Sequence, residues 1–250
     1  ALIGAYGSCG ELSRAFEAFG DMQARGVTPN NYVCSALVSA CGVANEPERA
    51  NDVLRWMRDN SVVPNAATCS AYVSTWAGAS GDWRKAQAAF QRARRLRADI
   101  AEAAGRPPLE RVLDSPDAHN ALLAAYASSG QVERALRAVM AMQRAGPPPD
   151  VATYGAVVAA CLKTNQWDRA LGVVEALVSG TGVTPNEAIF NSLLKAAAEA
   201  GDKATARIDD VRELMLRWQE QSARRDRAAR ADAASIGGDD GEGDGGVAAA

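Results

Sequence analysis

The chain repeats one arrangement of residues about every 35 positions. Two adjacent large apolar residues, followed three positions later by an apolar or small one, mark each unit. These groups start at Leu2, Leu37, Tyr72, Leu122, Val157 and Leu193, and the starts are 35, 35, 50, 35 and 36 residues apart. A small residue follows on the same period, as Ala15, Ala50, Ala86, Ala135, Ala170 and Ala206. A fixed period of this length is typical of solenoid proteins, in which short structural units stack on one another.

Each unit ends with a proline followed by Asn or Asp. These pairs are Pro29-Asn30, Pro64-Asn65, Pro116-Asp117, Pro149-Asp150 and Pro185-Asn186. Proline cannot continue a helix, whereas Asn and Asp accept hydrogen bonds from the first turn of the next one. Every unit is therefore predicted to form a helix, a turn, a second helix and a stop. Glycines that suit a left-handed turn stand between the two helices, as Gly10, Gly81, Gly130 and Gly201.

The second helix of each unit carries one apolar stripe at helical spacing. In one unit this stripe comprises Ala50, Val53, Leu54 and Met57. Neither helix of a unit can bury its stripe alone, but stacked pairs can. The composition is 48% hydrophobic and only 6% aromatic, which favours closely packed helices. We therefore predict an all-α solenoid of helix-turn-helix repeats in which the recurring alanines are buried.

The markers divide the chain into repeats of unequal regularity. We predict a partial repeat at 1–30, repeats at 31–65, 66–117, 118–150 and 151–186, a degenerate repeat at 187–221, a charged helical extension at 222–235 and a disordered, Gly/Asp-rich tail at 236–250. The third repeat is longer than the others and contains an insertion at about 96–114. The first repeat lacks the opening of its first helix. The chain is therefore expected to be part of a longer one, with any targeting peptide outside it.

Charge and cysteine content exclude several classes of protein. The chain has 27 Lys and Arg against 30 Asp and Glu, a net charge of −3, so it lacks the overall basic footprint of many nucleic-acid binders. No apolar run approaches the ~20 residues that a membrane-spanning helix needs. The five cysteines include no C-x-x-C pair, and two pairs of them, Cys34 with Cys69 and Cys41 with Cys161, occupy equivalent repeat positions. We expect them to be reduced core residues and predict no metal site.

Enzymatic chemistry is not indicated. His119 is the only histidine, and no nucleophile motif accompanies it. No Gly-rich phosphate loop occurs, since the residues after Gly237-Gly238 are acidic. We therefore expect no enzyme activity, no cofactor and no small-molecule substrate.

The 35-residue unit with its Pro-Asp or Pro-Asn ending resembles the pentatricopeptide repeat family. The clearest match is Pro149-Asp150-Val151-Ala152-Thr153-Tyr154 followed by Val157-Val158, and the resemblance covers residues 1 to about 221. Tetratricopeptide repeats have a period of 34 and a different signature. The resemblance implies a right-handed superhelix that binds single-stranded RNA, about one base per repeat, in a chloroplast or mitochondrion. It also allows for protein partners.

In this family, the fifth and last residues of a repeat reach one base edge. The resemblance therefore implies the pairs Ser35 with Asn65, Ser70 with Asp117 or Ser115, Asn120 with Asp150, and Gly155 with Asn186, then Asn191 alone. Lys163 is at a place that the family uses for phosphate. Family base preferences then predict the core 5′-A-G-U-N-Y-3′, in which the G depends on Asp117.

Alternative interpretations accompany these residues. Asn at the start of a helix is by default a cap. The basic cluster Arg84, Lys85, Arg92, Arg94, Arg95 and Arg97 is interpreted as a solvated helix face, and the tryptophans as packing residues. A protein-binding scaffold of tetratricopeptide type is the alternative function. Near-neutral charge and Gly155 favour the scaffold, whereas the recurring polar residues favour RNA.

Overall fold

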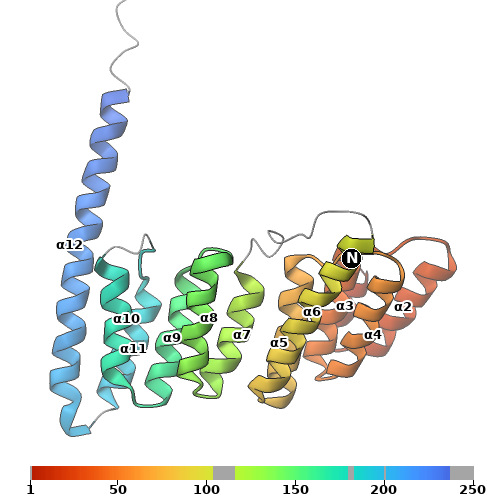
Figure 1. The fold of residues 1–250 in the computed structure, drawn as a ribbon, viewed down its shortest axis with the longest axis horizontal. Helices are drawn as coiled ribbons and strands as arrows, with labels where there is room; N and C mark the ends of the chain where they lie inside the picture. The colour runs from red at the N-terminus through yellow and green to blue at the C-terminus, as the bar shows by residue number, and fades with distance from the viewer. Residues whose placement is uncertain (1, 104–115, 180–182, 200, 237–250) are drawn as a thin grey trace, which may run out of the picture. The chain divides into compact units, whose positions relative to one another are not determined.

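The structure is a computed structural model that describes residues 2–103, 116–179, 183–199 and 201–236. Within these ranges the chain is helical and contains no strand, which confirms the predicted all-α repeat fold. The helices are α1 (Leu2–Ser8), α2 (Leu12–Ala24), α3 (Asn31–Val43), α4 (Pro47–Asp59), α5 (Ala66–Ser80), α6 (Trp83–Ala103), α7 (Asp117–Ser128), α8 (Val132–Ala145), α9 (Val151–Lys163), α10 (Trp167–Ser179), α11 (Glu187–Ala198), the 3-10 helix η1 (Gly201–Lys203) and α12 (Ala204–Ile236) (Figure 1). The helices belong to two compact units, residues 1–173 and 174–250.

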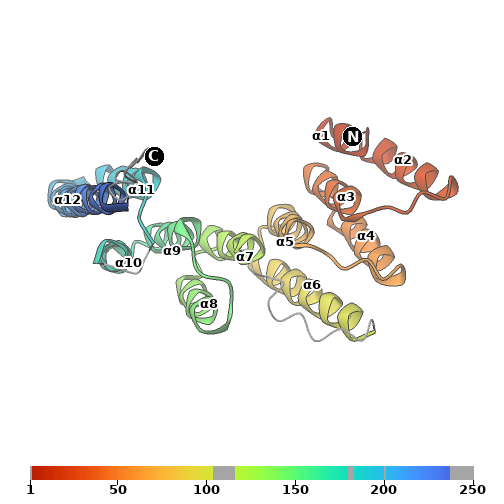
Figure 2. The ribbon, with the colours of Figure 1, turned by 90° about the horizontal axis from the view of Figure 1, so that it is seen from above.

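The first unit is built from helical hairpins stacked in sequence order. Each first helix packs on the next one along the chain, from α1 through α3, α5 and α7 to α9. Each second helix from α2 to α8 also contacts the first helix of the following repeat. Figure 2 shows α1, α3, α5, α7 and α9 in one row and α2, α4, α6 and α8 in another. Within this unit, the N-terminal ends of successive first helices therefore lie beside one another.

Side-chain caps begin four of the first helices, as the Pro-Asn and Pro-Asp pairs predict. In each case a side-chain oxygen of the cap residue accepts the backbone N–H of the residue three positions later, at 2.8–3.2 Å. The four caps are Asn30, Asn65, Asp150 and Asn186. The prediction is wrong for Asp117, which is the first residue of α7 while Pro116 occupies the cap position without a side-chain hydrogen bond. The long third repeat thus enters its next helix differently from the others.

The internal turns have the left-handed backbone that the glycines indicated. Gly10, Gly81, Gly130 and Gly201 have φ between +58° and +75°. In the two repeats without a glycine, Asn45 and Asn165 adopt the same conformation with φ of 58° and 56°. Asn tolerates this region better than most residues because its short amide can hydrogen-bond locally.

The recurring alanines hold the core of the first unit together. The prediction that they are buried is confirmed by their full burial at five positions, namely Ala15, Ala50, Ala86, Ala135 and Ala170. A side chain that ends at Cβ lets each second helix approach its neighbours closely. The prediction is wrong for Ala206, which is exposed. In α12, Val211 and Leu214 are buried. The residue four positions before Val211 and seven before Leu214, which is alanine in the other repeats, is Arg207 here and not Ala206.

Aromatic side chains join the third repeat to the fourth across the insertion. Trp83 of α6 lies 5.9 Å from Tyr126 of α7 between ring centroids, and the Arg134 guanidinium stacks on Trp83 at 4.0 Å. Phe90 of α6 meets the His119 ring edge to face at 4.8 Å. Residues 104–115, which include most of the predicted insertion, lie outside the described residues. The contacts on either side of them show that α6 and α7 pack directly.

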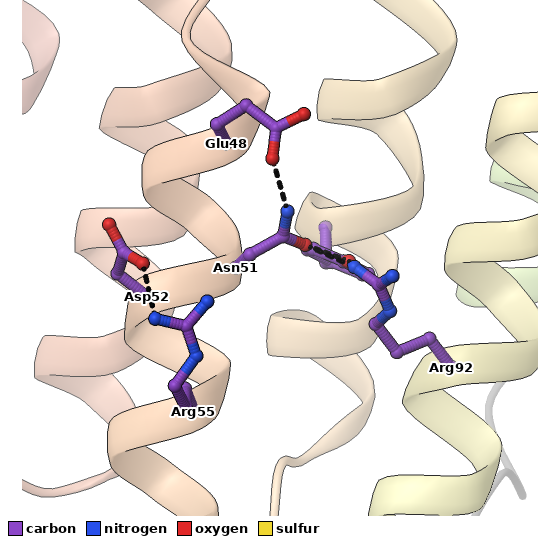
Figure 3. Close-up of polar contacts among 6 residues, drawn as sticks. Glu48, Asn51, Asp52, Arg55 and Arg92 are labelled. Atoms are coloured by element: carbon purple, nitrogen blue, oxygen red, sulfur yellow. Dashed lines mark hydrogen bonds and ion pairs between the residues drawn. The ribbon is translucent and has the colours of Figure 1, made fainter.

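The basic cluster of α6 is only partly a solvated face. Arg92 is exposed but reaches the neighbouring repeat, where its Nη1 donates to the Asn51 Oδ1 at 2.8 Å, and the Tyr72 hydroxyl donates to the same oxygen. Asn51 in turn donates to Glu48 at 2.8 Å (Figure 3). These bonds connect α4, α5 and α6.

Arg97 departs fully from the prediction. It is 4% exposed, and its guanidinium donates to the Pro64 carbonyl at the end of the preceding repeat. The prolonged α6 carries this side chain over that carbonyl and beside the buried Cys69, where desolvation raises the pKa of the thiol although Arg97 opposes the shift. Because α6 is longer than α2, α4, α8 and α10, the charged group of Arg97 is buried against the Pro64 carbonyl and does not face solvent.

The second unit consists of the C-terminal part of α10, α11, η1 and α12. Phe190 of α11 and Trp218 of α12 lie 5.3 Å apart between ring centroids, and Phe190 is fully buried. Val211 and Leu214 of α12 are also buried, and α11 packs on α12. The predicted charged extension at 222–235 falls on α12, and residues 237–250 of the predicted tail lie outside the described residues.

Ala135→Arg is expected to destabilise the fold strongly. The site is fully buried in α8, so the longer side chain overpacks the helix contact and brings a charge into it. We expect the free energy of unfolding to fall by more than about 3 kcal/mol in urea titrations. Ala141→Arg is the matched control, because Ala141 is on the exposed face of the same helix. Equal stability of the two variants would contradict the packing role.

His119 is expected to make stability depend on pH between about 6.5 and 4. Burial, with a smaller contribution from Arg94, lowers the pKa of the imidazole from 6.5 to about 4. The unfolded chain then binds a proton in this window that the folded chain does not, so stability falls as the pH falls. From pH 7 to 5 the loss should be about 1–2 kcal/mol. His119→Phe should remove this loss, because the chain has a single histidine. An unchanged difference between the two pH values in that variant would assign the effect to other groups.

Candidate nucleic-acid interface

The site predicted at Asn120 and Asp150 is assembled at the N-terminal ends of α7 and α9. Asp150 caps α9, where Pro149 ends the preceding segment and the carboxylate accepts the Thr153 N–H at 2.8 Å. Asn120 is in the first turn of α7, on the neighbouring first helix. Because α7 and α9 pack side by side, residues 30 positions apart come into contact.

A direct hydrogen bond joins the two predicted residues. The Asn120 Nδ2 lies 3.1 Å and 3.2 Å from the two carboxylate oxygens of Asp150. Both side chains are partly exposed. The pair therefore forms a preorganised polar surface with unused hydrogen-bonding capacity: one N–H and one oxygen lone pair of the amide, and lone pairs of the carboxylate.

Thr153 completes this cluster and was not among the residues predicted from the sequence. Its hydroxyl lies 2.7 Å from the Asn120 Oδ1 and 2.8 Å from the Asp150 Oδ1, and it accepts the Asp150 backbone N–H at 3.1 Å. The side chain is fully buried behind the other two. The signal available in the sequence is a threonine three residues after a helix cap, a spacing that permits a reciprocal capping box.

The cluster keeps Asp150 ionised. Partial burial alone would raise the pKa of its carboxyl, but hydrogen bonds from Thr153 and Asn120 outweigh that effect and hold the pKa below its ordinary value. At neutral pH the site therefore presents a carboxylate that accepts hydrogen bonds and does not donate one. A donor on a base, such as an N–H group, suits this charge.

Ser35 and Asn65 occupy the equivalent places two repeats earlier in the stack, at the junction of α3 and α5. Ser35 is partly exposed on α3, and Asn65 is the exposed cap of α5. The Asn65 Oδ1 accepts both the Thr68 N–H and the Thr68 hydroxyl at 2.9 Å. The amide group of Asn65 therefore keeps its Nδ2 hydrogens available for other partners.

The third repeat has an incomplete pair. The Ser70 hydroxyl donates to the backbone carbonyl of Asp117 at 3.4 Å, which is long for such a bond. Counting back five positions from Asn120, as in the other repeats, places the last residue of this repeat at Ser115, which lies outside the described residues. Asp117 is then the second residue of the fourth repeat. It is exposed, as are the second residues of three other repeats, Tyr32, Ala67 and Ala152.

The remaining predicted pair is divided between the two compact units. Gly155 is on α9 in the first unit and offers no side chain, while Asn186 caps α11 in the second unit and accepts the Ile189 N–H at 3.2 Å. Asn191 is exposed on α11.

Lys163 is at the opposite end of α9 from Asp150, roughly 20 Å along the helix. Its ammonium group is exposed and donates to the Ser128 carbonyl at the C-terminal end of α7. A cation suits this place because the last carbonyls of a helix carry partial negative charge. A phosphate bound by Lys163, as predicted, would share the ammonium group with the Ser128 carbonyl.

The described residues offer no other site of recognisable chemistry. None of the helices in these ranges has the length and hydropathy to cross a bilayer, and nowhere in them do three His, Cys, Asp or Glu side chains gather as metal ligands would. All five cysteines are free and four are buried, and burial raises the pKa of Cys34 to about 11. The four buried cysteines are core residues, as expected, whereas the expectation is wrong for Cys9, which is exposed.

Comparisons with known proteins agree with this architecture. The family model of a pentatricopeptide repeat domain matches residues 1–78, and the model of the pentacotripeptide-repeat region of PRORP matches residues 77–224. The comparison with curated proteins gave no match.

Solved structures show the same fold. The crystal structure of the pentatricopeptide repeat protein PPR10 in complex with an 18-nt psaJ RNA element is 23% identical and has a TM-score of 0.55, with 87% of this chain and 27% of that chain covered. The structure of PPR10 from maize is 27% identical with a TM-score of 0.53, over 84% and 28% of the two chains. The chain thus spans about a quarter of the length of these relatives.

The 35-residue period, the capped helical hairpins and two family models that together match residues 1–224 lead to one assignment. The chain belongs to the pentatricopeptide repeat family.

Proposed function

We propose that this chain binds single-stranded RNA with sequence selectivity and supports RNA processing, stability or translation in a chloroplast or mitochondrion. The observation that carries the proposal is the hydrogen-bonded pair of Asn120 and Asp150 at the junction of α7 and α9. Capping requires Asp150 alone. The second residue, on another helix, adds a partly exposed amide to the same surface.

The chemistry of this pair suits a base edge. An amide supplies one donor and one acceptor side by side, and the ionised carboxylate supplies further acceptors. Recognition of unstacked bases through their hydrogen-bonding edges is the usual basis of selectivity for single-stranded RNA. The relative in complex with an 18-nt psaJ RNA element has the same fold, which supports RNA as the ligand class here.

The proposed order of bases follows from the pairs along the chain. In the family code, Ser35 with Asn65 corresponds to A and Asn120 with Asp150 to U. Ser70 corresponds to G with Asp117 as its partner, and this assignment fails if the repeat ends at Ser115. Gly155 with Asn186 leaves its base undetermined, and Asn191 corresponds to a pyrimidine. The proposed core is therefore 5′-A-G-U-N-Y-3′, and U is the position at which both residues and their hydrogen bonds are present.

Contacts between the protein and the phosphate backbone of the RNA should contribute modestly to affinity. The net charge of −3 leaves few phosphate contacts, and Lys163 is the one predicted residue that can make one. Binding should therefore depend weakly on salt, because few counterions are released. We propose no enzymatic activity for this chain.

Asn120→Ser is expected to shift the preference at one base from U towards G and to leave the neighbouring bases unchanged. The shorter hydroxyl side chain cannot present the donor and acceptor pair of the amide. A wrong base that leaves hydrogen bonds unmade should cost on the order of 1–3 kcal/mol. Binding of the wild type and the variant to four RNAs that differ only at this base would measure the shift.

Asn60→Ser is the matched control for this experiment. Asn60 follows α4 at the far end of a second helix, and its amide donates to the Trp56 carbonyl. That variant should keep the wild-type preference for U. If the wild type binds all four RNAs with equal affinity at moderate salt, the proposed base code is wrong, and the protein-binding scaffold becomes the better interpretation.

A further inference from the structure

We infer that Thr153 is a positioning residue that fixes the orientation of the Asn120 amide and thereby separates U from C. This inference rests on the proposed function. Thr153 is fully buried, so its hydroxyl can act on a base only through another side chain. Thr153 acts through the Asn120 amide, whose nitrogen donates hydrogen bonds and whose oxygen accepts them.

The hydrogen bonds around Thr153 leave one consistent arrangement. The hydroxyl has a single hydrogen, and two oxygens lie within reach: the Asn120 Oδ1 at 2.7 Å and the Asp150 Oδ1 at 2.8 Å. The Asp150 Oδ1 already accepts the Thr153 N–H and an N–H of Asn120. The shorter contact is to Asn120, whose amide oxygen then receives the hydroxyl hydrogen. The amide is held at both ends, with its oxygen on Thr153 and its nitrogen on Asp150.

Helix capping does not require this hydroxyl. At the equivalent positions of two other first helices the residue is aliphatic, and Asn30 and Asn186 cap through the N–H groups of Val33 and Ile189 alone. At the start of α5 the Thr68 hydroxyl donates to its own cap, Asn65. The Thr153 hydroxyl differs because it reaches across to α7 in the preceding repeat. That contact makes the orientation of Asn120 depend on the next repeat.

Orientation of the amide decides between the two pyrimidines. Uracil and cytosine have the same ring size, but their hydrogen-bonding edges run in opposite order. Uracil places the O4 acceptor beside the N3–H donor, whereas cytosine places the N4 amino donor beside the N3 acceptor. An amide turned by half a rotation exchanges its own donor and acceptor and would fit cytosine instead. An amide locked at both ends can match only one of the two.

Thr153→Val tests the role directly, because valine keeps the shape of the buried side chain and removes the hydroxyl. The full chain would be measured against two RNAs, 5′-AGUAU-3′ and 5′-AGCAU-3′, under conditions in which circular dichroism shows both proteins folded. We expect the ratio of the affinities for U and C to fall about five- to tenfold, the effect of one lost hydrogen bond. Thr153→Ser, which keeps the hydroxyl, should retain the wild-type ratio.

Thr68→Val is the matched control, since it removes the equivalent hydroxyl at a junction that does not contact Asn120. It should leave the U to C ratio at the Asn120 position unchanged. If Thr153→Val weakens binding to both RNAs equally, or if Thr68→Val lowers the ratio as much, the hydroxyl is only structural and the inference fails. A wild type without any preference for U over C would contradict the proposed function itself.

A measurement on the unmodified protein covers the case in which the valine variant does not fold. A held amide exchanges its hydrogens slowly and is detected by nuclear magnetic resonance. The Nδ2 hydrogens of Asn120 should exchange more slowly than those of Asn191, which is exposed on α11. Equal exchange rates would show that the Asn120 amide is not held.

Discussion

The close approach of neighbouring helices at five fully buried alanines is the constraint on which the other features depend. Ala135, for example, has no side chain beyond Cβ, so α8 can pack against both α7 and α9. This packing sets the spacing of the first helices and brings their N-terminal ends side by side. The contact between Asn120 and Asp150 exists because the stack places α7 next to α9. A larger residue at the alanine would separate the hairpins before it disturbed any single helix.

Capping and recognition use the same atoms in this architecture. Asp150 stabilises the start of α9 through the Thr153 N–H and also holds the Asn120 amide. The capping interpretation of these residues and the RNA interpretation are therefore compatible, since a carboxylate has enough acceptor positions for both tasks. The cap gives the site rigidity: Asp150 is fixed by its own helix before a ligand arrives. A helix without such a cap would have to order this side chain on binding, at an entropic cost.

The third repeat shows how an insertion changes the chemistry of a regular unit. Its second helix, α6, continues to Ala103 and carries Arg97 into the interior, where the guanidinium meets the Pro64 carbonyl. The next helix then starts with Pro116 at its cap and without the usual side-chain hydrogen bond. The aromatic contacts of Trp83 with Tyr126 and of Phe90 with His119 nevertheless keep α6 on α7. Packing tolerates the insertion better than the cap does, because packing needs apolar area whereas a cap needs one side chain at one position.

The sequence by itself determined the period, the helices, four of the caps and the burial of five alanines, because each depends on residues a few positions apart. It also placed Asn120 and Asp150 as partners, through resemblance to a family. Only the tertiary structure decided which side chains meet across repeats: the hydroxyl of Thr153 on Asn120, the burial of Arg97 and the exposure of Ala206. A long or polar side chain can take several orientations on its own helix. The neighbouring helix selects one of them, through the surface it buries and the hydrogen-bond partners it offers.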